Sequence, residues 1–139
     1  MLLHVIARGK IGRSPEAELV ERYLKRIAWP TKLTEISERA PALPVASSTV
    51  TVLLDEKGEA LSSTELAKKL EQWRDRGTRV ARFVIGAADG HSAEERSAAD
   101  LLISFGPATW PHLLVRAMLA EQLFRATSIL ANHPYHREG

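Results

Sequence analysis

The tail of the chain gathers side chains that can act on another molecule. The stretch NHPYHREG, residues 132–139, holds two histidines, a tyrosine and an arginine close to one proline. Histidine exchanges a proton near neutral pH, a tyrosine ring stacks on a nucleic-acid base, and arginine donates a forked pair of hydrogen bonds to a phosphate. Chain ends usually tolerate change, so a segment this rich in chemistry predicts a functional tail that contacts nucleic acid.

A metal site is an alternative use of the same tail. His133 and His136 stand three residues apart, a spacing that can bring two imidazoles to one ion. Zinc in proteins takes three or four protein ligands, and neither a cysteine nor an acidic cluster accompanies these histidines. The sequence therefore predicts no metal site, and nucleic-acid contact remains the favoured interpretation.

Three loops that follow predicted strands are candidates for a cofactor pocket. The apolar runs 50–54, 80–85 and 101–105 are typical of buried strands, and DEKGEALS, GAADGH and GPATWPH follow them. Ligands of open α/β sheets bind beyond the carboxyl ends of the strands, where glycine lets the backbone approach closely. The third loop leads into Pro111 and His112 at an expected helix start, which favours an anionic group.

Ordinary strand-to-helix turns are the alternative interpretation of these loops. None of them carries the P-loop pattern or the GxGxxG fingerprint, which disfavours a nucleoside triphosphate or a dinucleotide as the ligand. Two further strands are indicated by the apolar run 2–7 and, more weakly, by residues 33–36.

Capping residues mark the helices that must position the loops. The expected caps, in chain order, are Ser14 with Pro15, Ser62 with Glu65, and Ser92 with Glu95. The helix after Ser92 is expected to span about ten residues, and a last helix of roughly 20 residues to run from Pro111 to near Ala131. Strands and helices thus alternate along the chain, which predicts one α/β domain over 1–139 with a mostly parallel sheet flanked by helices.

Composition narrows the function classes. With 139 residues, of which 45% are hydrophobic, the chain can close a core, and the lack of cysteine excludes a disulfide framework. The chain has no signal-peptide pattern and no run of roughly 20 apolar residues, so we expect a cytoplasmic protein without a membrane partner. A net charge of +2 permits an RNA partner only through local basic patches.

Basic side chains on two predicted helices and near one strand are candidates for phosphate contacts. They are Arg22, Lys25 and Arg26, and then Arg74, Arg76, Arg79 and Arg82. For each of them a solvated charged face is the alternative. In the last helix Glu121 and Arg125 stand four apart and are expected to pair on a solvated face, while Arg116 lies one turn from the proposed ligand end.

Three long stretches together match the pattern of one known family. They are PHLLVRAMLAEQLFRATSILANHPYHRE at 111–138, FVIGAADG at 83–90 and LLDEKGEALSSTELAKKLEQW at 53–73. They resemble the C-terminal signature, the glycine loop and the preceding strand, loop and helix of the ribosomal large-subunit methyltransferase H family, small bacterial enzymes of the SPOUT class. The resemblance implies S-adenosylmethionine as cofactor, methylation of N3 of a pseudouridine in the 23S ribosomal RNA of the assembled ribosome, a homodimer, and a trefoil knot within about residues 80–139.

The resemblance also assigns site residues. Cofactor contacts are implied at Leu54, Gly86, Ala87, Gly106, Pro107, Ala108, Thr109, Trp110 and Pro111. The tail residues Tyr135, His136 and Arg137 are expected to reach the partner subunit's cofactor and touch the target nucleotide. Either His112 or His136 would help remove the imide proton, Arg137 would stabilise the developing charge, and Arg116 would fix the geometry of the RNA or the tail.

Two departures from the family pattern support an alternative function. The family usually has glycine at the position of Ala87 and often a serine-containing pair at Gly106 and Pro107. A positive φ at an alanine would add strain of about 1 kcal/mol. The alternative is a non-catalytic module that binds RNA or the ribosome and has a decayed cofactor site.

Overall fold

A computed structural model describes residues 1–137, and it is organised around a parallel sheet; residues 138 and 139 of the predicted domain lie outside the described part. The strands are β1 (Leu2–Arg8), β2 (Thr31–Ile36), β3 (Thr49–Glu59), β4 (Val80–Ile85) and β5 (Leu101–Ile103). Their order is β2-β1-β4-β3-β5, and every neighbouring pair is parallel. The predicted α/β architecture is confirmed, including the weakly indicated strand around residues 33–36.

Helices begin where the capping residues predict. They are α1 (Pro15–Arg26), α2 (Ser63–Asp75), α3 (Ala93–Ala98) and α4 (His112–Leu130). Ser14 accepts a hydrogen bond from the Ala17 N–H, and Ser62 and Ser92 form the expected reciprocal bonds with the glutamates three residues on. Within the described residues, no helix combines the length and apolar character needed to cross a membrane.

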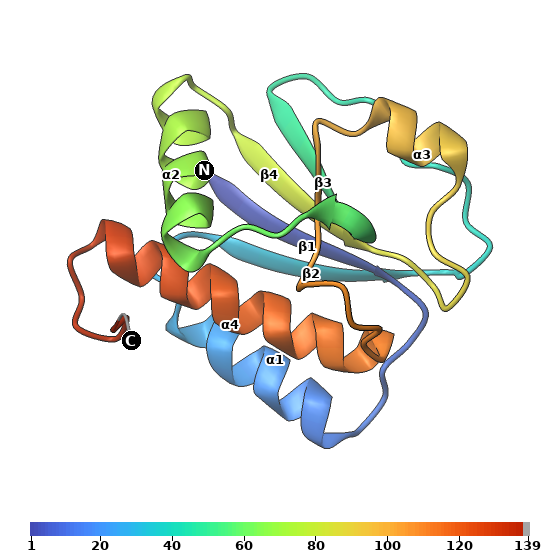
Figure 1. Ribbon diagram of the computed structural model, residues 1–139, viewed down its shortest axis with the longest axis horizontal. Helices are drawn as coiled ribbons and strands as arrows, with labels where there is room; N and C mark the ends of the chain where they lie inside the picture. Colours follow the sequence, from blue (N-terminus) through green and yellow to red (C-terminus); the bar gives the residue numbers. More distant parts are fainter. Residues whose placement is uncertain (138–139) are drawn as a thin grey trace.

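Helices α1, α2 and α4 lie on one side of the sheet and α3 on the other (Figure 1). Alternate strand residues such as Leu3 and Phe83 pack with Leu119 and Leu123 of α4 in the larger core. On the opposite face the strands bury a smaller cluster made by Ile6, Leu53 and Val84, against which Leu43, Ala99 and other partly buried side chains pack. Helix α4 packs against α1 and α2 as well as the sheet, and side chains on several of its faces are therefore buried.

The segment after Leu54 differs from the prediction. We expected a loop beginning at Asp55, but β3 continues to Glu59, which pairs with Ile103 after an irregularity in the register. A Cβ added to Gly58 would lie 2.6 Å from backbone atoms of Leu102 and Ile103, so glycine permits the two strands to approach here. The turn-forming residues therefore build a bulge in the strand instead of ending it.

Helix α3 and strand β5 are shorter than predicted. Helix α3 ends after six residues because Ala99 is already extended, with φ −75° and ψ 148°. The next residue, Asp100, is held by Thr51: its N–H donates to the Thr51 carbonyl, and its carboxylate accepts the Thr51 N–H at 2.8 Å. This contact sets the start of β5, which ends at Ile103 instead of the predicted residue 105.

Candidate functional site

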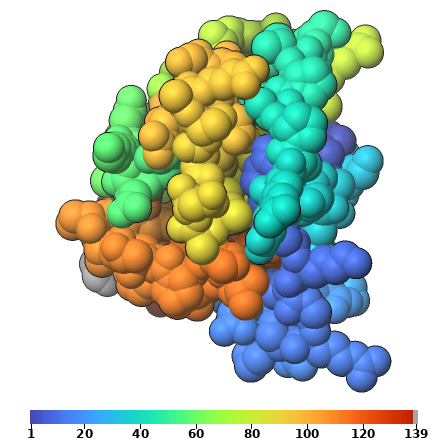
Figure 2. Space-filling view, turned by 90° about the vertical axis from the view of Figure 1, so that its right-hand side faces the viewer, coloured from blue at the N-terminus to red at the C-terminus, as the bar shows by residue number. Residues whose placement is uncertain are grey.

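A pocket of about 390 Å³ opens at the carboxyl ends of β3, β4 and β5. Two loops form much of its wall, residues 86–91 after β4 and residues 104–111 before α4. Figure 2 shows the first loop, in yellow, lying against the orange segment that leads into α4. The sequence-predicted cofactor residues that line the pocket are Leu54, Gly86, Ala87, Gly106, Ala108, Thr109, Trp110 and Pro111; Pro107 does not line it.

The glycine loop after β4 accommodates Ala87 without backbone strain. Within the described residues Ala87 is not among those with positive φ, and it forms an isolated bridge with Gly90, whose φ is +80°. Gly86 needs to be glycine for a different reason, because a Cβ there would lie 3.2 Å from the Gly90 carbonyl carbon and from the His91 ring. The expected cost of the alanine is therefore absent, and the loop keeps the close backbone approach that a ligand needs.

The start of α4 borders the same pocket. His112 is the first residue of the helix and lines the pocket beside Pro111, the N-cap residue, which makes no side-chain capping bond. The first N–H groups of a helix have no partner within the helix, and together with the helix dipole they favour an anionic group. The geometry therefore agrees with the anion preference predicted for this position.

Charged groups in the pocket wall were missed by the sequence analysis. Nε of Arg96 donates to the Asp55 carboxylate at 2.8 Å, and Glu56 and Asp89 line the pocket as well. Burial raises the pKa of Asp55, but hydrogen bonds from the Lys57 N–H and from Arg96 outweigh it and leave the pKa below its ordinary value. The signal was present, since Asp55, Glu56 and Asp89 all belong to the loops that follow predicted strands.

The tail folds back onto the far end of α4. The Tyr135 ring packs on the edge of Phe124 with centroids 4.6 Å apart, and its hydroxyl donates to Glu121 at 3.2 Å. Arg125 pairs with Glu121 at 2.7 Å, as predicted, and also donates to Nδ1 of His136 at 3.2 Å. This pair is partly buried rather than solvated, because the tail covers it.

Helix α4 separates the tail from the pocket. It spans 19 residues, with His112 at its start and the tail attached beyond its end. At 1.5 Å per residue, the two ends lie roughly 28 Å apart, and Figure 1 shows the tail at the opposite end of the helix from the loops of the pocket. A single chain therefore does not bring Tyr135, His136 and Arg137 to the predicted cofactor residues.

Comparison with known proteins assigns the family. The family model described as a predicted SPOUT methyltransferase matches residues 1–136. A protein of Erythrobacter litoralis named ribosomal RNA large subunit methyltransferase H is 66% identical over 140 residues, which cover 100% of both chains. The chain belongs to the ribosomal RNA large subunit methyltransferase H family. A member of this family from Rhizorhabdus wittichii is 64% identical over 140 residues, again covering 100% of both chains.

Solved structures related to this methyltransferase H chain confirm the fold. A probable methylase family protein from Haemophilus influenzae has a TM-score of 0.60 at 11% identity, over 94% of this chain and 66% of that one. A probable methyltransferase from Bordetella pertussis has a TM-score of 0.55 at 12% identity, over 91% and 95% of the two chains. At these low identities the similarity supports the fold and gives no information on function.

Arg116 occupies a buried position behind the start of α4. The residue is 2% exposed, its guanidinium pairs with Glu35 at 2.6 Å, and it donates to the Gly9 carbonyl at 3.0 Å. It thereby ties α4 of this methyltransferase H chain to the segments that follow β1 and end β2. These contacts position the helix that carries His112.

Acid is expected to destabilise the fold through Glu35. Burial raises the pKa of Glu35, but hydrogen bonds from Arg116 and the Ile11 N–H outweigh it and leave the pKa below its ordinary 4.5. Because the pKa of Glu35 is lower in the folded than in the unfolded protein, its ionised carboxylate stabilises the fold fully above about pH 4.5. This stabilisation is lost as the pH falls through the pKa of the folded protein. The free energy of unfolding, measured with urea between pH 7 and pH 3, should fall as the pH is lowered. It should fall less steeply in a Glu35→Gln variant. Identical pH profiles for the two proteins would contradict this.

The candidate phosphate-binding residues divide into two groups. Arg82 is used within the fold, since its guanidinium donates to the Thr51 hydroxyl and the Pro44 carbonyl, both at 2.6 Å. The other six candidates are exposed: Arg22, Lys25, Arg26, Arg74, Arg76 and Arg79. Arg76 and Arg79 lie between α2 and β4, at the edge of the sheet away from the pocket. In one chain Arg76 and Arg79 therefore lie at the opposite end of β4 from the pocket.

Proposed function

We propose that this chain transfers a methyl group from S-adenosylmethionine to N3 of a pseudouridine in 23S ribosomal RNA, on the assembled ribosome in the cytoplasm. The observation that carries the proposal is the pocket at the carboxyl edge of the sheet. It is lined by all but one of the residues expected to hold the cofactor. Relatives that match the chain over its full length are named ribosomal RNA large subunit methyltransferase H.

The residues that line the pocket fit such a cofactor. Gly86 allows the backbone to approach the ligand closely, and the N–H groups at the start of α4 suit a carboxylate. When bound, S-adenosylmethionine supplies a methyl group already activated by its sulfonium. Backbone at Leu54, Gly86 and Ala87, together with Gly106 and residues 108–111, would hold it, so that the acceptor nitrogen can be aligned with the methyl group.

Proton removal from the imide is assigned to a histidine. His112 lines the pocket, and His136 belongs to the tail. An imidazole can accept a proton near neutral pH, which suits an imide nitrogen that must lose one. Arg137 is exposed and can stabilise the negative charge on the imide oxygens. Arg116 acts indirectly, by holding α4 and hence His112 in place.

A homodimer completes the proposed site. Within one chain the tail lies at the far end of α4, roughly 28 Å from the pocket by helix length. A tail that serves in catalysis must therefore reach the pocket of a second copy, which brings Tyr135, His136 and Arg137 to the partner's cofactor. No group of three or more potential metal ligands occurs among residues 1–137, and the proposal includes no metal.

The proposal also includes a trefoil knot within about residues 80–139, in one domain over 1–139. The path of β3 supports it. Leu54 and Glu59 both pair with Ile103, and the Ser104 N–H donates to the Glu59 carbonyl at 2.9 Å. The bulge of β3 thus bends around the end of β5, immediately before the chain enters the loop that leads to α4.

Titration with S-adenosylmethionine tests the cofactor assignment. We expect micromolar binding with one site per chain, measured by calorimetry, followed by transfer of a labelled methyl group to ribosomes that lack the modification. No binding, in the presence or absence of ribosomes, would favour the non-catalytic module with a decayed pocket.

Histidine variants test the proton-transfer step. At least one of His112→Ala and His136→Ala should lower turnover by about a hundredfold, the lower range for a general base. His4→Ala is the control, because Nε2 of His4 contacts the Thr34 hydroxyl at 2.8 Å and the residue does not line the pocket. Near-normal turnover in both test variants would exclude a histidine base.

A further inference from the structure

Helix α3 is attached to the fold mainly by polar contacts. It has only six residues and none of them is buried, although it directly follows the glycine loop of the pocket. A short element without buried apolar side chains opens locally at low cost. The few side chains that hold it therefore decide where the glycine loop lies.

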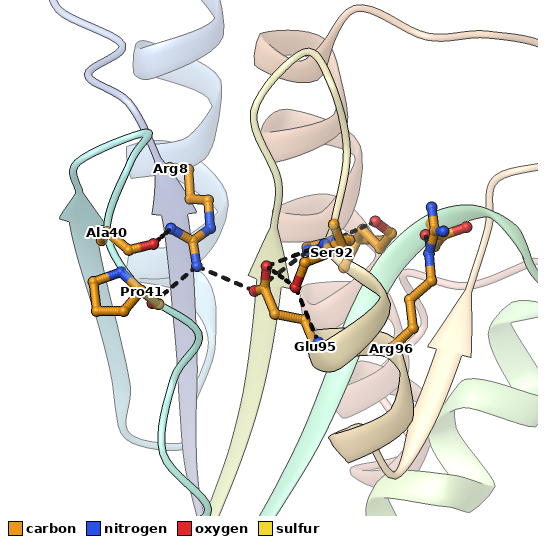
Figure 3. A network of polar contacts seen from close by, with 9 residues as sticks. Arg8, Ala40, Pro41, Ser92, Glu95 and Arg96 are labelled. Carbon is orange, nitrogen blue, oxygen red and sulfur yellow. Dashed lines mark hydrogen bonds and ion pairs between the residues drawn. The ribbon is translucent and has the colours of Figure 1, made fainter.

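A buried arginine reaches this helix from the first strand. Arg8, at the end of β1, is 4% exposed and donates to the Ala40 and Pro41 carbonyls. Its second terminal nitrogen also donates to the Glu95 carboxylate of α3 at 3.1 Å. Figure 3 shows this guanidinium between the segment at 40–41 and the start of α3. It joins three parts of the chain that are distant in sequence.

Glu95 connects Arg8 to the pocket wall. One carboxylate oxygen accepts the Ser92 N–H at 3.3 Å. The other lies 3.7 Å from Nδ1 of His91, which is too far for a hydrogen bond but within range of an ion pair with a protonated ring. The His91 side chain is 0% exposed, and its Nε2 donates to the Leu54 carbonyl at 2.9 Å. Its ring also limits the space beside Gly86. The chain of contacts from Arg8 therefore ends on the backbone of two proposed cofactor-binding residues.

We propose that Arg8 and Glu95 are positioning residues for the cofactor pocket, acting through His91 on the Leu54 carbonyl and the glycine loop. The inference rests on the proposed function, since the ligand of the pocket is S-adenosylmethionine. A buried ion pair adds little stability compared with apolar side chains of the same size, because both charges lose their hydration. The contribution of this pair is instead to hold α3 and the adjoining glycine loop in one position, because α3 has no buried side chain to do so.

Cofactor titration of matched variants tests the inference. Glu95→Gln and Arg8→Met should each weaken S-adenosylmethionine binding by about tenfold, and the double variant by no more than about tenfold, because the two residues act along one path. Glu21→Gln is the control, since it also removes a carboxylate that pairs with a basic side chain, Lys25 at 2.7 Å, but on α1 and outside the cofactor pocket. Affinities of the single variants within about twofold of the unmodified chain, or a double variant weakened about a hundredfold, would overturn the inference.

A second measurement separates this inference from the proposed function. If the unmodified chain binds no S-adenosylmethionine, the proposed function fails, and amide hydrogen exchange then tests the positioning role alone. Exchange across residues 86–96 should be faster in Glu95→Gln than in Glu21→Gln, and the increase there should exceed any increase in the core strands β1 and β4, which report global stability. Equal exchange in this segment would overturn the positioning role.

Discussion

Replacing Gly58 with alanine is expected to cost about 3 kcal/mol or more of folding free energy, the upper range for overpacking. The added Cβ would lie 2.6 Å from the Leu102 carbonyl carbon and the Ile103 nitrogen. Both contacts are with backbone, so no side chain can rotate away to relieve them. The neighbouring strand β5 has three residues and, among residues 1–137, pairs with β3 alone, so it cannot shift without losing its place in the sheet.

Urea unfolding of Gly58→Ala against a matched glycine variant measures this effect. Gly77→Ala is the control, because a Cβ there meets nothing within 4 Å although its φ is +89°. It should cost only the backbone strain of a left-handed alanine, about 1 kcal/mol. If the two variants lost equal stability, the close approach of β3 to β5 would not be what requires glycine at position 58.

Deleting residues 133–139 is expected to lower methyl transfer by about 10² to 10³-fold, the range for removal of a general base and a charge-stabilising group. The dissociation constant of the cofactor should change by less than about threefold, which is under 1.4 kcal/mol of binding free energy. The reason is that the residues lining the pocket lie between Leu54 and Val115, outside the deleted segment. Loss of the Tyr135 contact with Phe124 should reduce stability by about 1 kcal/mol. Loss of cofactor binding in parallel with activity would instead show that the tail helps to hold the cofactor.

Mixed dimers decide which subunit each tail serves. A chain without its tail, refolded together with a Gly86→Val chain, should recover roughly a quarter of normal activity, since half of randomly paired dimers are mixed and each holds one complete site. The valine side chain fills the space that Gly86 leaves beside Gly90 and His91, so that chain supplies only its tail. A mixture as inactive as its two components would show that the tail acts within its own chain.

Local signals predicted most of the secondary structure. Ser14, Ser62 and Ser92 cap helices as expected, because a capping bond involves residues only three apart. The bulge at residues 55–59 was not predicted, since its pairing with Ile103 depends on a strand more than 40 residues later in the chain. The early end of α3 was not predicted either, and next to it Asp100 bonds with Thr51, 49 residues away in the sequence.

The sequence predicts those parts of the candidate site that directly follow a strand. It does not predict contacts between residues that are far apart in the sequence. The residues predicted in the glycine loops line one pocket, because parallel strands bring their carboxyl ends to the same end of the sheet. The ion pair between Arg8 and Glu95 spans 87 residues, and no periodicity reveals it. One signal existed: Arg8 is a charge at the end of the apolar run LLHVIA, which places it beside a buried strand.

The packing of α4 against the sheet affects how the protein can fold during its synthesis. Leu119 and Leu123 of α4 complete the core beneath β1, β3 and β4, and α4 follows all five strands in the sequence. During translation, the apolar strands leave the exit tunnel before the helix that must cover them. The sheet face beneath α4 therefore stays exposed until α4 has been synthesised, and we expect the larger core to close only after Leu123 has left the tunnel.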